Sequence, residues 1–159
     1  MYNKFEDEVA IRALVSAYAD AVNRRDAEGM AAVMAPDGII EKPGYGDPVH
    51  GHEKILKRYR RLQREREFLF QQIHSGVVHV DGDRATARWC FSETKLAVGS
   101  SDWLSMFGVY QDEAVRLTEG WRFARRVQTT IMERRLPGGA KVTIHDLPDF
   151  FDIPGLPTL

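Results

Sequence analysis

The sequence contains a single cysteine, Cys90, among its 159 residues. One cysteine cannot form an intramolecular disulfide, which excludes a secreted scaffold held by disulfides and favours a reducing compartment. It also excludes a metal site built from several thiolates. We expect Cys90 to be inert, because it alternates with Trp89 along a predicted strand and therefore faces away from the side that Trp89 occupies.

Long apolar runs and an excess of charge of either sign are also missing. No stretch approaches the roughly 18 apolar residues of a membrane span, and the first ten residues, MYNKFEDEVA, lack the apolar region of a signal peptide. The 22 basic and 23 acidic residues give a net charge of -1. This balance gives no reason to expect nucleic acid or a membrane surface as a partner. We expect one cytoplasmic domain, for which 43% hydrophobic residues provide a core.

Two helices are predicted near the N-terminus. Across residues 9–26, large apolar side chains recur at offsets of three and four, and a second face carries alanines. Asp26 is a suitable N-cap for a second helix over residues 27–35. A brief strand over residues 39–42 and a glycine- and proline-rich loop over residues 43–51 follow. The large apolar residues of the first helix are Ile11, Leu14, Val15, Tyr18 and Val22, and the alanines are Ala10, Ala13, Ala17 and Ala21.

A third helix is predicted over residues 52–68, and it carries seven basic side chains. Such a run suggests contact with nucleic acid. However, Glu53, Glu65 and Glu67 lie among the basic residues, and this mixture is typical of a solvated helix face. We therefore favour the solvated face.

From residue 68 onward, alternating patterns predict four long strands. Residues 68–80 and 85–98 flank the turn Asp81-Gly82-Asp83, and residues 102–117 and 121–136 flank the turn Thr118-Glu119-Gly120. Helices followed by an antiparallel meander predict an α+β fold with helices on one face of the sheet. Because strands of this length coil, we expect a strongly curved, cone-shaped sheet that encloses a hollow.

Alternation along these strands predicts which side chains line the hollow. As single residues, the aromatics on the predicted inner faces are also suitable core residues. Together they exceed what a thin interface between a sheet and helices needs, which favours an aromatic-lined pocket for an apolar ligand. The predicted inner faces carry Ala85, Ala87, Trp89 and Phe91 on one strand, Trp103, Phe107 and Val109 on the next, and Trp121 and Phe123 on the last.

Four segments carry a family resemblance: YADAVNRRDAEGMAAVMAPDGII, GHEKI, HSGVVHVDGDRATAR and GVYQDEAVRLTEGWRFARR. They resemble the SnoaL-like branch of the nuclear-transport-factor-2-like superfamily over residues 6–135. The resemblance implies a cystatin-like α+β barrel, in which three N-terminal helices cover a mostly antiparallel sheet around one deep pocket, and assembly as a homodimer or homotrimer. We expect the domain to span residues 1–135, with residues 136–159 as an extension that packs on the barrel or on a partner subunit.

The resemblance extends to a branch that contains scytalone dehydratase, hexachlorocyclohexane dehydrochlorinase and bile-acid dehydratase, which hold an Asp–His pair in the pocket. The matching residues here are Asp20, in YAD, and His74, in QIHSG. A histidine oriented by a carboxylate removes a proton near neutral pH. Two alternatives stay open: Asp20 lies nearly opposite Ile11 on the helical wheel and fits a solvated carboxylate, and His74 fits a strand histidine bonded to a carbonyl.

The resemblance therefore implies a cofactor-independent lyase or isomerase that acts on a small, largely apolar cyclic substrate. The alternative is a non-catalytic module that binds a ligand or assembles with a partner, such as an oxygenase small subunit. We expect no metal site, because His50 and His52 lack a third ligand. The expected substrate-binding residues are Tyr18, Tyr45, Trp89, Phe91, Trp103, Phe107 and Tyr110.

Overall fold

The computed structural model describes residues 3–138 of the chain. Their helices are α1 (Lys4–Asn23), α2 (Ala27–Ala32) and α3 (His52–Arg64). Their strands are β1 (Met34–Glu41), β2 (Val49–His50), β3 (Arg66–Asp81), β4 (Arg84–Ala97), β5 (Trp103–Leu117) and β6 (Gly120–Leu136). Most of the predicted C-terminal extension, residues 139–159, lies outside the described residues.

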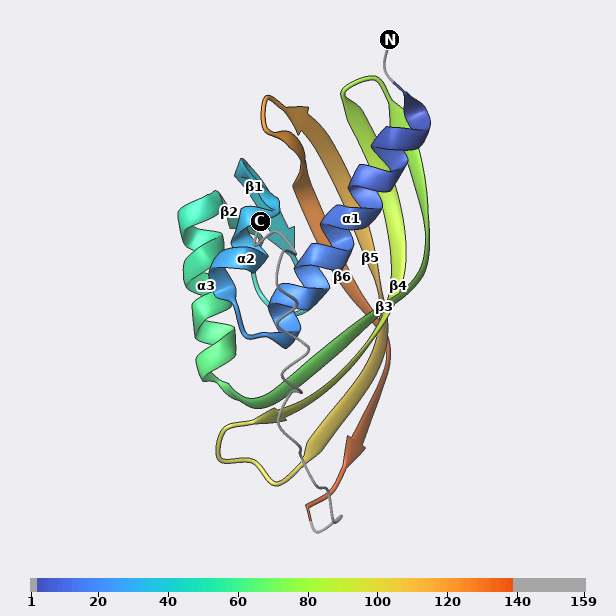
Figure 1. Cartoon of the computed structure of the whole chain (residues 1–159). Helices are drawn as coiled ribbons and strands as arrows, with labels where there is room; N and C mark the ends of the chain where they lie inside the picture. Colours follow the sequence, from blue (N-terminus) through green and yellow to red (C-terminus); the bar gives the residue numbers. More distant parts are fainter. Residues whose placement is uncertain (1–2, 139–159) are drawn as a thin grey trace.

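The strands form one sheet in the order β2-β1-β6-β5-β4-β3. β1 runs parallel to β6, and the other neighbours are antiparallel. Figure 1 shows the long strands curving around the helices, with α1 crossing the sheet and α2 and α3 beside β1 and β2. The sheet is not closed, because β2 and β3 are its two edges. The predicted α+β fold, with helices on one face of a curved and mostly antiparallel sheet, is confirmed.

The start of α2 follows a local signal, whereas the helix ends follow tertiary pairing. Asp26 caps α2 as predicted, since its side chain accepts a hydrogen bond of 2.8 Å from the backbone N–H of Gly29. α2 ends earlier than predicted, because the chain enters β1 at Met34 and pairs with β6. α3 also ends early, at Arg64, because the following residues pair with β4. Sheet pairing therefore overrides helical propensity at both boundaries.

One face of α1 packs on the sheet and the other faces solvent. The exposed part of α1 includes Ala10 and Ala13 of the predicted alanine face. The small residues therefore do not mark a second packing surface along the whole helix. The predicted large apolar stripe is buried throughout, and its members are Ile11, Leu14, Val15, Tyr18 and Val22.

The predicted inner face is correct for β4 and wrong for β5, where Trp103, Phe107 and Val109 all lie on the face opposite to Tyr110. Trp89 is buried on β4 as predicted, but Phe107 on β5 is 52% exposed. The pairing of β4 with β5 explains the difference, because residues directly opposite each other share a face of the sheet. Tyr110 lies opposite Trp89 and Phe107 lies opposite Ser92. The inner face of β5 is therefore the one that carries Tyr110.

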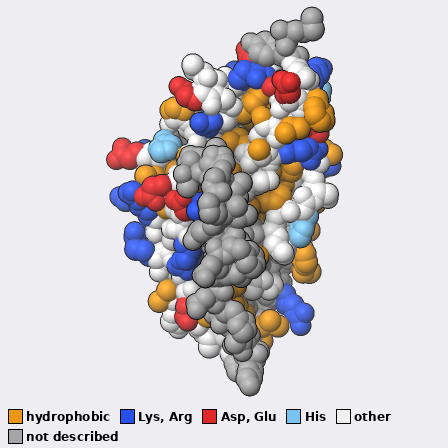
Figure 2. All heavy atoms as spheres, in the orientation of Figure 1, with side chains coloured by type: hydrophobic (Ala, Val, Ile, Leu, Met, Phe, Trp, Pro, Cys, Tyr) orange, Lys and Arg blue, Asp and Glu red, His pale blue; other side chains and the backbone are white. Residues whose placement is uncertain are grey.

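The basic side chains of α3 mostly face solvent, as the charge pattern predicts. Arg60 pairs with Glu28 of α2, and Arg61 pairs with Glu65 after the end of α3. Figure 2 shows acidic side chains among the basic ones on this side of the molecule. Within residues 3–138, no helix is both long enough and apolar enough to cross a bilayer.

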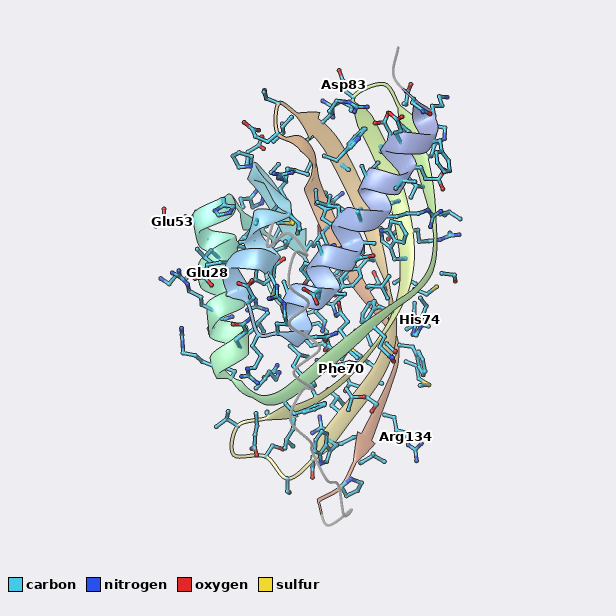
Figure 3. All side chains as sticks on the ribbon, viewed as in Figure 1. Glu28, Glu53, Phe70, His74, Asp83 and Arg134 are labelled. Atoms are coloured by element: carbon cyan, nitrogen blue, oxygen red, sulfur yellow. The ribbon has the colours of Figure 1, made fainter. Side chains whose placement is uncertain are left out.

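A buried carboxylate fastens the N-terminal end of α1 to the strands. Asp7 accepts a hydrogen bond of 3.1 Å from Trp121 Nε1, and its Oδ2 lies 2.6 Å from Arg116 Nη2. Arg116 also pairs at 3.0 Å with Asp83, which lies in the turn between β3 and β4 (Figure 3). The hydrogen bond from Arg116 holds the pKa of Asp7 below its ordinary value, although burial acts in the opposite direction.

We predict that Asp7→Asn lowers the free energy of unfolding at neutral pH by about 1–3 kcal/mol, because a buried charged hydrogen-bond acceptor is lost. The pKa of Asp7 is lower in the folded protein, so its carboxylate stabilises the fold fully above the unfolded-state pKa of about 4. That contribution disappears as the pH falls through the lower folded-state pKa. Denaturant unfolding at neutral and acidic pH measures both effects.

The matched control is Asp83→Asn, which removes a 61% exposed carboxylate from the same arginine. We expect a much smaller loss of stability, because exposed ion pairs contribute little. Equal losses for the two variants, or the same loss for Asp7→Asn at both pH values, would contradict this account.

Candidate functional site

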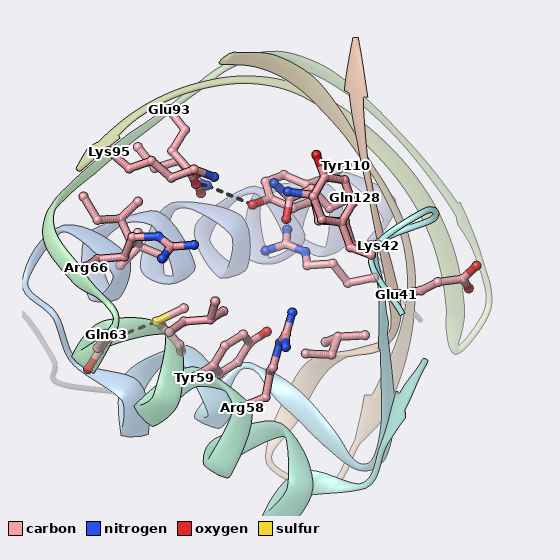
Figure 4. Close-up of a pocket in the computed structure, with 18 of the residues that line it drawn as sticks. Glu41, Lys42, Arg58, Tyr59, Gln63, Arg66, Glu93, Lys95, Tyr110 and Gln128 are labelled. Atoms are coloured by element: carbon pink, nitrogen blue, oxygen red, sulfur yellow. Dashed lines mark hydrogen bonds and ion pairs between the residues drawn. The ribbon is translucent and has the colours of Figure 1, made fainter. Parts of the chain in front are cut away.

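A cavity of about 470 Å³ lies between the inner face of the sheet and helices α1 and α3. Residues from α2 and from all six described strands complete its walls, together with the loop between β1 and β2. Figure 4 shows side chains from these elements converging on the open space. Its volume falls within the range of about 300–1,000 Å³ that is typical of small-molecule sites.

A buried ion pair forms one wall of this cavity. Arg126 on β6 donates two parallel hydrogen bonds of 2.8 Å to Asp112 on β5, and both side chains are almost fully buried. The guanidinium lies 4.2–4.3 Å from the ring centroids of Tyr18, Tyr110 and Phe123. Burial alone would lower the pKa of Arg126, but the charge of Asp112 and its hydrogen bonds raise it. The guanidinium therefore stays charged inside the protein.

Three buried tyrosines gather beside this pair. Tyr18 makes edge-to-face contacts with Tyr59 and Tyr110, with ring centroids 6.1 and 5.9 Å apart. Burial raises the pKa of Tyr18, and it raises those of Tyr59 and Tyr110 further above the ordinary value. The charge of Arg126 and hydrogen bonding with Tyr110 and Tyr59 partly oppose burial at Tyr18. All three hydroxyls therefore keep their protons at neutral pH and can donate hydrogen bonds.

A chain of hydrogen bonds connects this tyrosine cluster to a carboxylate. Gln71 Nε2 donates to Glu93 Oε2 at 3.0 Å and to the Tyr110 hydroxyl at 2.9 Å. The other oxygen of Glu93 accepts from Lys95 Nζ at 2.9 Å. Gln71 and Glu93 are 2% and 9% exposed, so water has little access to the carboxylate. Figure 4 shows Glu93, Lys95 and Tyr110 along one side of the cavity.

Asn23 holds Gln71 in place from the end of α1. Its side-chain N–H donates to the backbone oxygen of Gln71 at 2.8 Å, and its side-chain oxygen accepts from the backbone N–H at 2.7 Å. The backbone N–H and C=O of Gln71, which lies on an edge strand, thus both have hydrogen-bond partners. Where we expected an acid and an imidazole to join α1 to β3, the structure joins them through the amide side chain of Asn23 and the backbone of Gln71.

Three of the seven expected substrate-binding residues line the cavity: Tyr18, Tyr45 and Tyr110. Tyr45 belongs to the loop between β1 and β2 and is largely exposed. Lys42 Nζ lies 4.1 Å from the centre of its ring. Tyr45 is therefore at the solvent side of the cavity, whereas Tyr18 and Tyr110 are at its buried end.

The other four expected residues do not line the cavity. Phe91 is fully buried behind Tyr110, with the two rings stacked at 4.5 Å. Trp89 is buried in the core. Trp103 packs against the ring of Phe68 at the start of β5, and Phe107 lies on the outer face of the sheet. The aromatic lining is therefore smaller than predicted, and charged residues take its place.

Asp20 does not point into the cavity. Its carboxylate is 50% exposed and pairs with Arg24 one turn further along, at 2.9 Å. It lies on the side of α1 that also leaves Ala13 in solvent. The predicted inward orientation of Asp20 is not found, because α1 buries only one face.

His74 lies on the outer face of the sheet, away from the helices (Figure 3). The side chain is exposed, and its Nε2 is 2.8 Å from Ser92 Oγ. A β-bulge between Ile73 and Gly76 explains this orientation. Unbroken alternation back from Gly76 would turn His74 inward, but the extra residue reverses the pattern and turns Gln71 inward instead. The structure therefore places Asp20 and His74 in different environments.

The sequence interpretation missed Gln71, Glu93, Lys95 and Arg126 as pocket residues. The sequence pattern could have predicted that Glu93 and Lys95 point inward, because they continue the alternation that places Phe91 on the inner face of β4. Arg126 had none, because a second irregularity in the pairing of β5 with β6 shifts the pattern just before it. Within the described part of the chain, no group of three or more histidine, cysteine or acidic side chains is arranged to hold a metal ion.

Comparisons with known proteins agree with the fold. The SnoaL-like domain family matches residues 3–127. The uncharacterized protein Rv2910c of Mycobacterium tuberculosis is 27% identical over 135 residues, which cover 84% of this chain and 91% of that protein. A solved NTF2-like protein with a cystatin-like fold, from Novosphingobium aromaticivorans, is 24% identical with a TM-score of 0.68, over 80% of this chain and 84% of that chain. A hexachlorocyclohexane dehydrochlorinase is 18% identical with a TM-score of 0.77, over 96% of this chain and 97% of that chain.

We predict that Asp112→Ala lowers the free energy of unfolding by about 3–5 kcal/mol, because it leaves the buried charge of Arg126 without a partner. Urea unfolding measures this loss. The control is Arg125→Ala, which breaks the partly exposed pair with Glu41 and should have little effect. The double variant Asp112→Leu/Arg126→Met should be more stable than Asp112→Ala. If Asp112→Ala lowers the free energy of unfolding as little as the control does, the pair between Arg126 and Asp112 is not needed to stabilise the fold.

Proposed function

Because the chain belongs to the SnoaL-like domain family, we propose that its cavity catalyses proton transfer next to a carbonyl group of a small cyclic molecule. The reaction is that of a lyase or isomerase and uses the protein's own side chains. The observation that supports this most directly is the shared contact at Gln71, whose amide nitrogen donates both to the Glu93 carboxylate and to the Tyr110 hydroxyl. A proton acceptor and proton donors thus lie on one wall of the same cavity.

Glu93 is the base in this proposal. Its contacts with Lys95 and Gln71 use one position on each carboxylate oxygen and leave other lone pairs for a substrate proton. The same contacts hold the carboxylate in one orientation, and the surrounding protein shields it from water. A positioned general base typically contributes a factor of about 10² to 10⁴ in rate.

Tyr18 is the hydrogen-bond donor to the carbonyl oxygen. Burial raises the pKa of Tyr18, although hydrogen bonding with Tyr110 and Tyr59 partly opposes this effect. Tyr18 therefore has its own proton to offer to a ligand in the cavity. An O–H fixed in advance stabilises the charge that develops on a carbonyl oxygen as the neighbouring carbon loses a proton.

The proposed reaction begins when Glu93 takes a proton from the carbon next to the carbonyl. The electron pair of that C–H bond moves toward the carbonyl oxygen and forms an enolate, which Tyr18 stabilises. The proton then returns to a different carbon in an isomerisation, or a group on the adjacent carbon leaves in an elimination. The name of the dehydrochlorinase among the fold neighbours supports elimination as one of the two outcomes. Asp20 and His74 take no part, because neither lines the cavity.

A non-catalytic ligand-binding module is the second candidate. The observation that favours it is the contact between Asn23 and Gln71, since a neutral side chain and a backbone segment join α1 to β3 where an ionisable pair would transfer protons. In that case the same cavity holds a ligand without changing it.

Deuterium exchange tests the proposal without knowledge of the natural substrate. A base that removes a proton next to a carbonyl in D₂O leaves deuterium at that carbon. We predict that the protein accelerates deuterium uptake at the methyl group of acetophenone, followed by NMR. Glu93→Gln should slow the reaction by about 10² to 10⁴ and Tyr18→Phe by about 10² to 10³.

His74→Ala is the control and should keep the wild-type rate, because the side chain lies on the outer face of the sheet. Thermal unfolding of each variant excludes loss of the fold as the cause of a slower rate. If the wild type does not accelerate exchange over buffer, or if Glu93→Gln keeps the full rate, the proposed base is wrong.

A further inference from the structure

We infer that the ligand of this cavity carries an anionic oxygen group, a carboxylate or a phosphate, at the end opposite its reacting carbonyl. The inference rests on the proposed function for the position of the carbonyl, and it adds the class of substrate. It depends on three cations, Lys42, Arg58 and Arg66, which we call the cationic rim. All three line the cavity.

Among the described residues, the cationic rim has no carboxylate partner. Within residues 3–138, no carboxylate lies within ion-pair distance of Lys42, Arg58 or Arg66. Within the described part of the chain, the Arg66 side chain donates to the backbone oxygen of Glu65 at 3.1 Å, and Lys42 lies over the ring of Tyr45. By contrast, the charged side chains at the other end of the cavity, Arg126, Glu93 and Lys95, have ion-pair partners.

The acidic residues of the lining form no ion pair with the rim residues. Glu41 pairs with Arg125 and points away from the cavity in Figure 4, and Glu93 pairs with Lys95. Asp47 and Glu133 also line the cavity and are exposed to solvent. The space between the rim residues is therefore one in which an added negative charge is favourable.

The rim residues are partly buried, so their mutual repulsion is not fully screened by water. Burial lowers the pKa of Lys42, and the positive charges of Lys95 and Arg66 lower it further, although Glu93 and Glu133 act in the opposite direction. A bound anion would relieve this repulsion. Arginine is suited to the task, because its planar N–H groups match the oxygens of a carboxylate or phosphate.

The burial of the lining side chains therefore decreases from one end of the cavity to the other. The end with Tyr18, Tyr110 and Glu93 is deeply buried, whereas Arg58 and Arg66 are only half-buried. Figure 4 shows both arginines reaching from α3 and β3 toward the open space. A ketone with a distal acidic group fits this gradient, with its carbonyl at the tyrosines and its anionic oxygens at the rim.

A matched set of ligands tests the inference: acetophenone, para-acetylbenzoate and para-acetylphenyl phosphate. They share one ketone and differ only in the group at the far end of the ring. We expect isothermal titration to show that at least one of the two anions binds about tenfold or more tightly than acetophenone, the gain that charge-assisted hydrogen bonds typically bring. The preference between the two anions identifies carboxylate or phosphate as the natural group. The gain should shrink as salt is added.

Arg58→Gln and Arg66→Gln should each weaken binding of the preferred anion by about tenfold and leave acetophenone unaffected. The control is Lys57→Gln, which removes the same charge from the neighbouring residue on α3 that faces solvent. Equal affinity for all three ligands, or an equal loss in the control, would overturn the inference. Failure of the exchange assay with intact anion preference would instead overturn only the proposed base.

Discussion

The pocket depends on the buried pair between Arg126 and Asp112. A full positive charge inside a protein needs a partner, and Asp112 provides one through two parallel hydrogen bonds. The guanidinium also makes cation–π contacts with aromatic rings from α1, β5 and β6. The pair thus fixes the position of α1 on the sheet as well as joining two strands. Tyr18 and Tyr110 take their positions from this contact, and the hydrogen-bonded chain to Glu93 starts from Tyr110.

The sequence predicts those features of the fold that depend on local signals. The apolar stripe of α1, the cap at Asp26 and the two short turns between long strands each follow from residues close together in the chain. The inner face of β4 was also predictable, because its alternation is unbroken from Ala85 to Phe91. These features, with the family resemblance, were sufficient for the α+β fold and for a hollow on the helical side of the sheet.

The composition of the pocket was harder to predict, because it depends on pairing between distant strands. The face that each residue of β5 presents follows from its register with β4, which no local pattern encodes. Bulges in β3 and β6 reverse the alternation within single strands. Gln71 and Arg126 each lie just beyond such a shift, and both were missed for that reason. Asp20 was misplaced for a different reason, since a helical pattern does not reveal whether a weakly apolar face will be covered.

The bulge in β3 also has a chemical meaning for this protein. β3 is an edge strand with one neighbour, so a change in its alignment disturbs only one ladder of hydrogen bonds. In the present alignment the wall holds an amide, Gln71, while an imidazole, His74, faces outward. Moving the irregularity toward the start of the strand would turn Gln71 outward and bring Gln72 and His74 inward without altering the composition of the chain. Whether this wall can relay protons is thus decided by strand alignment as well as by the identity of its residues.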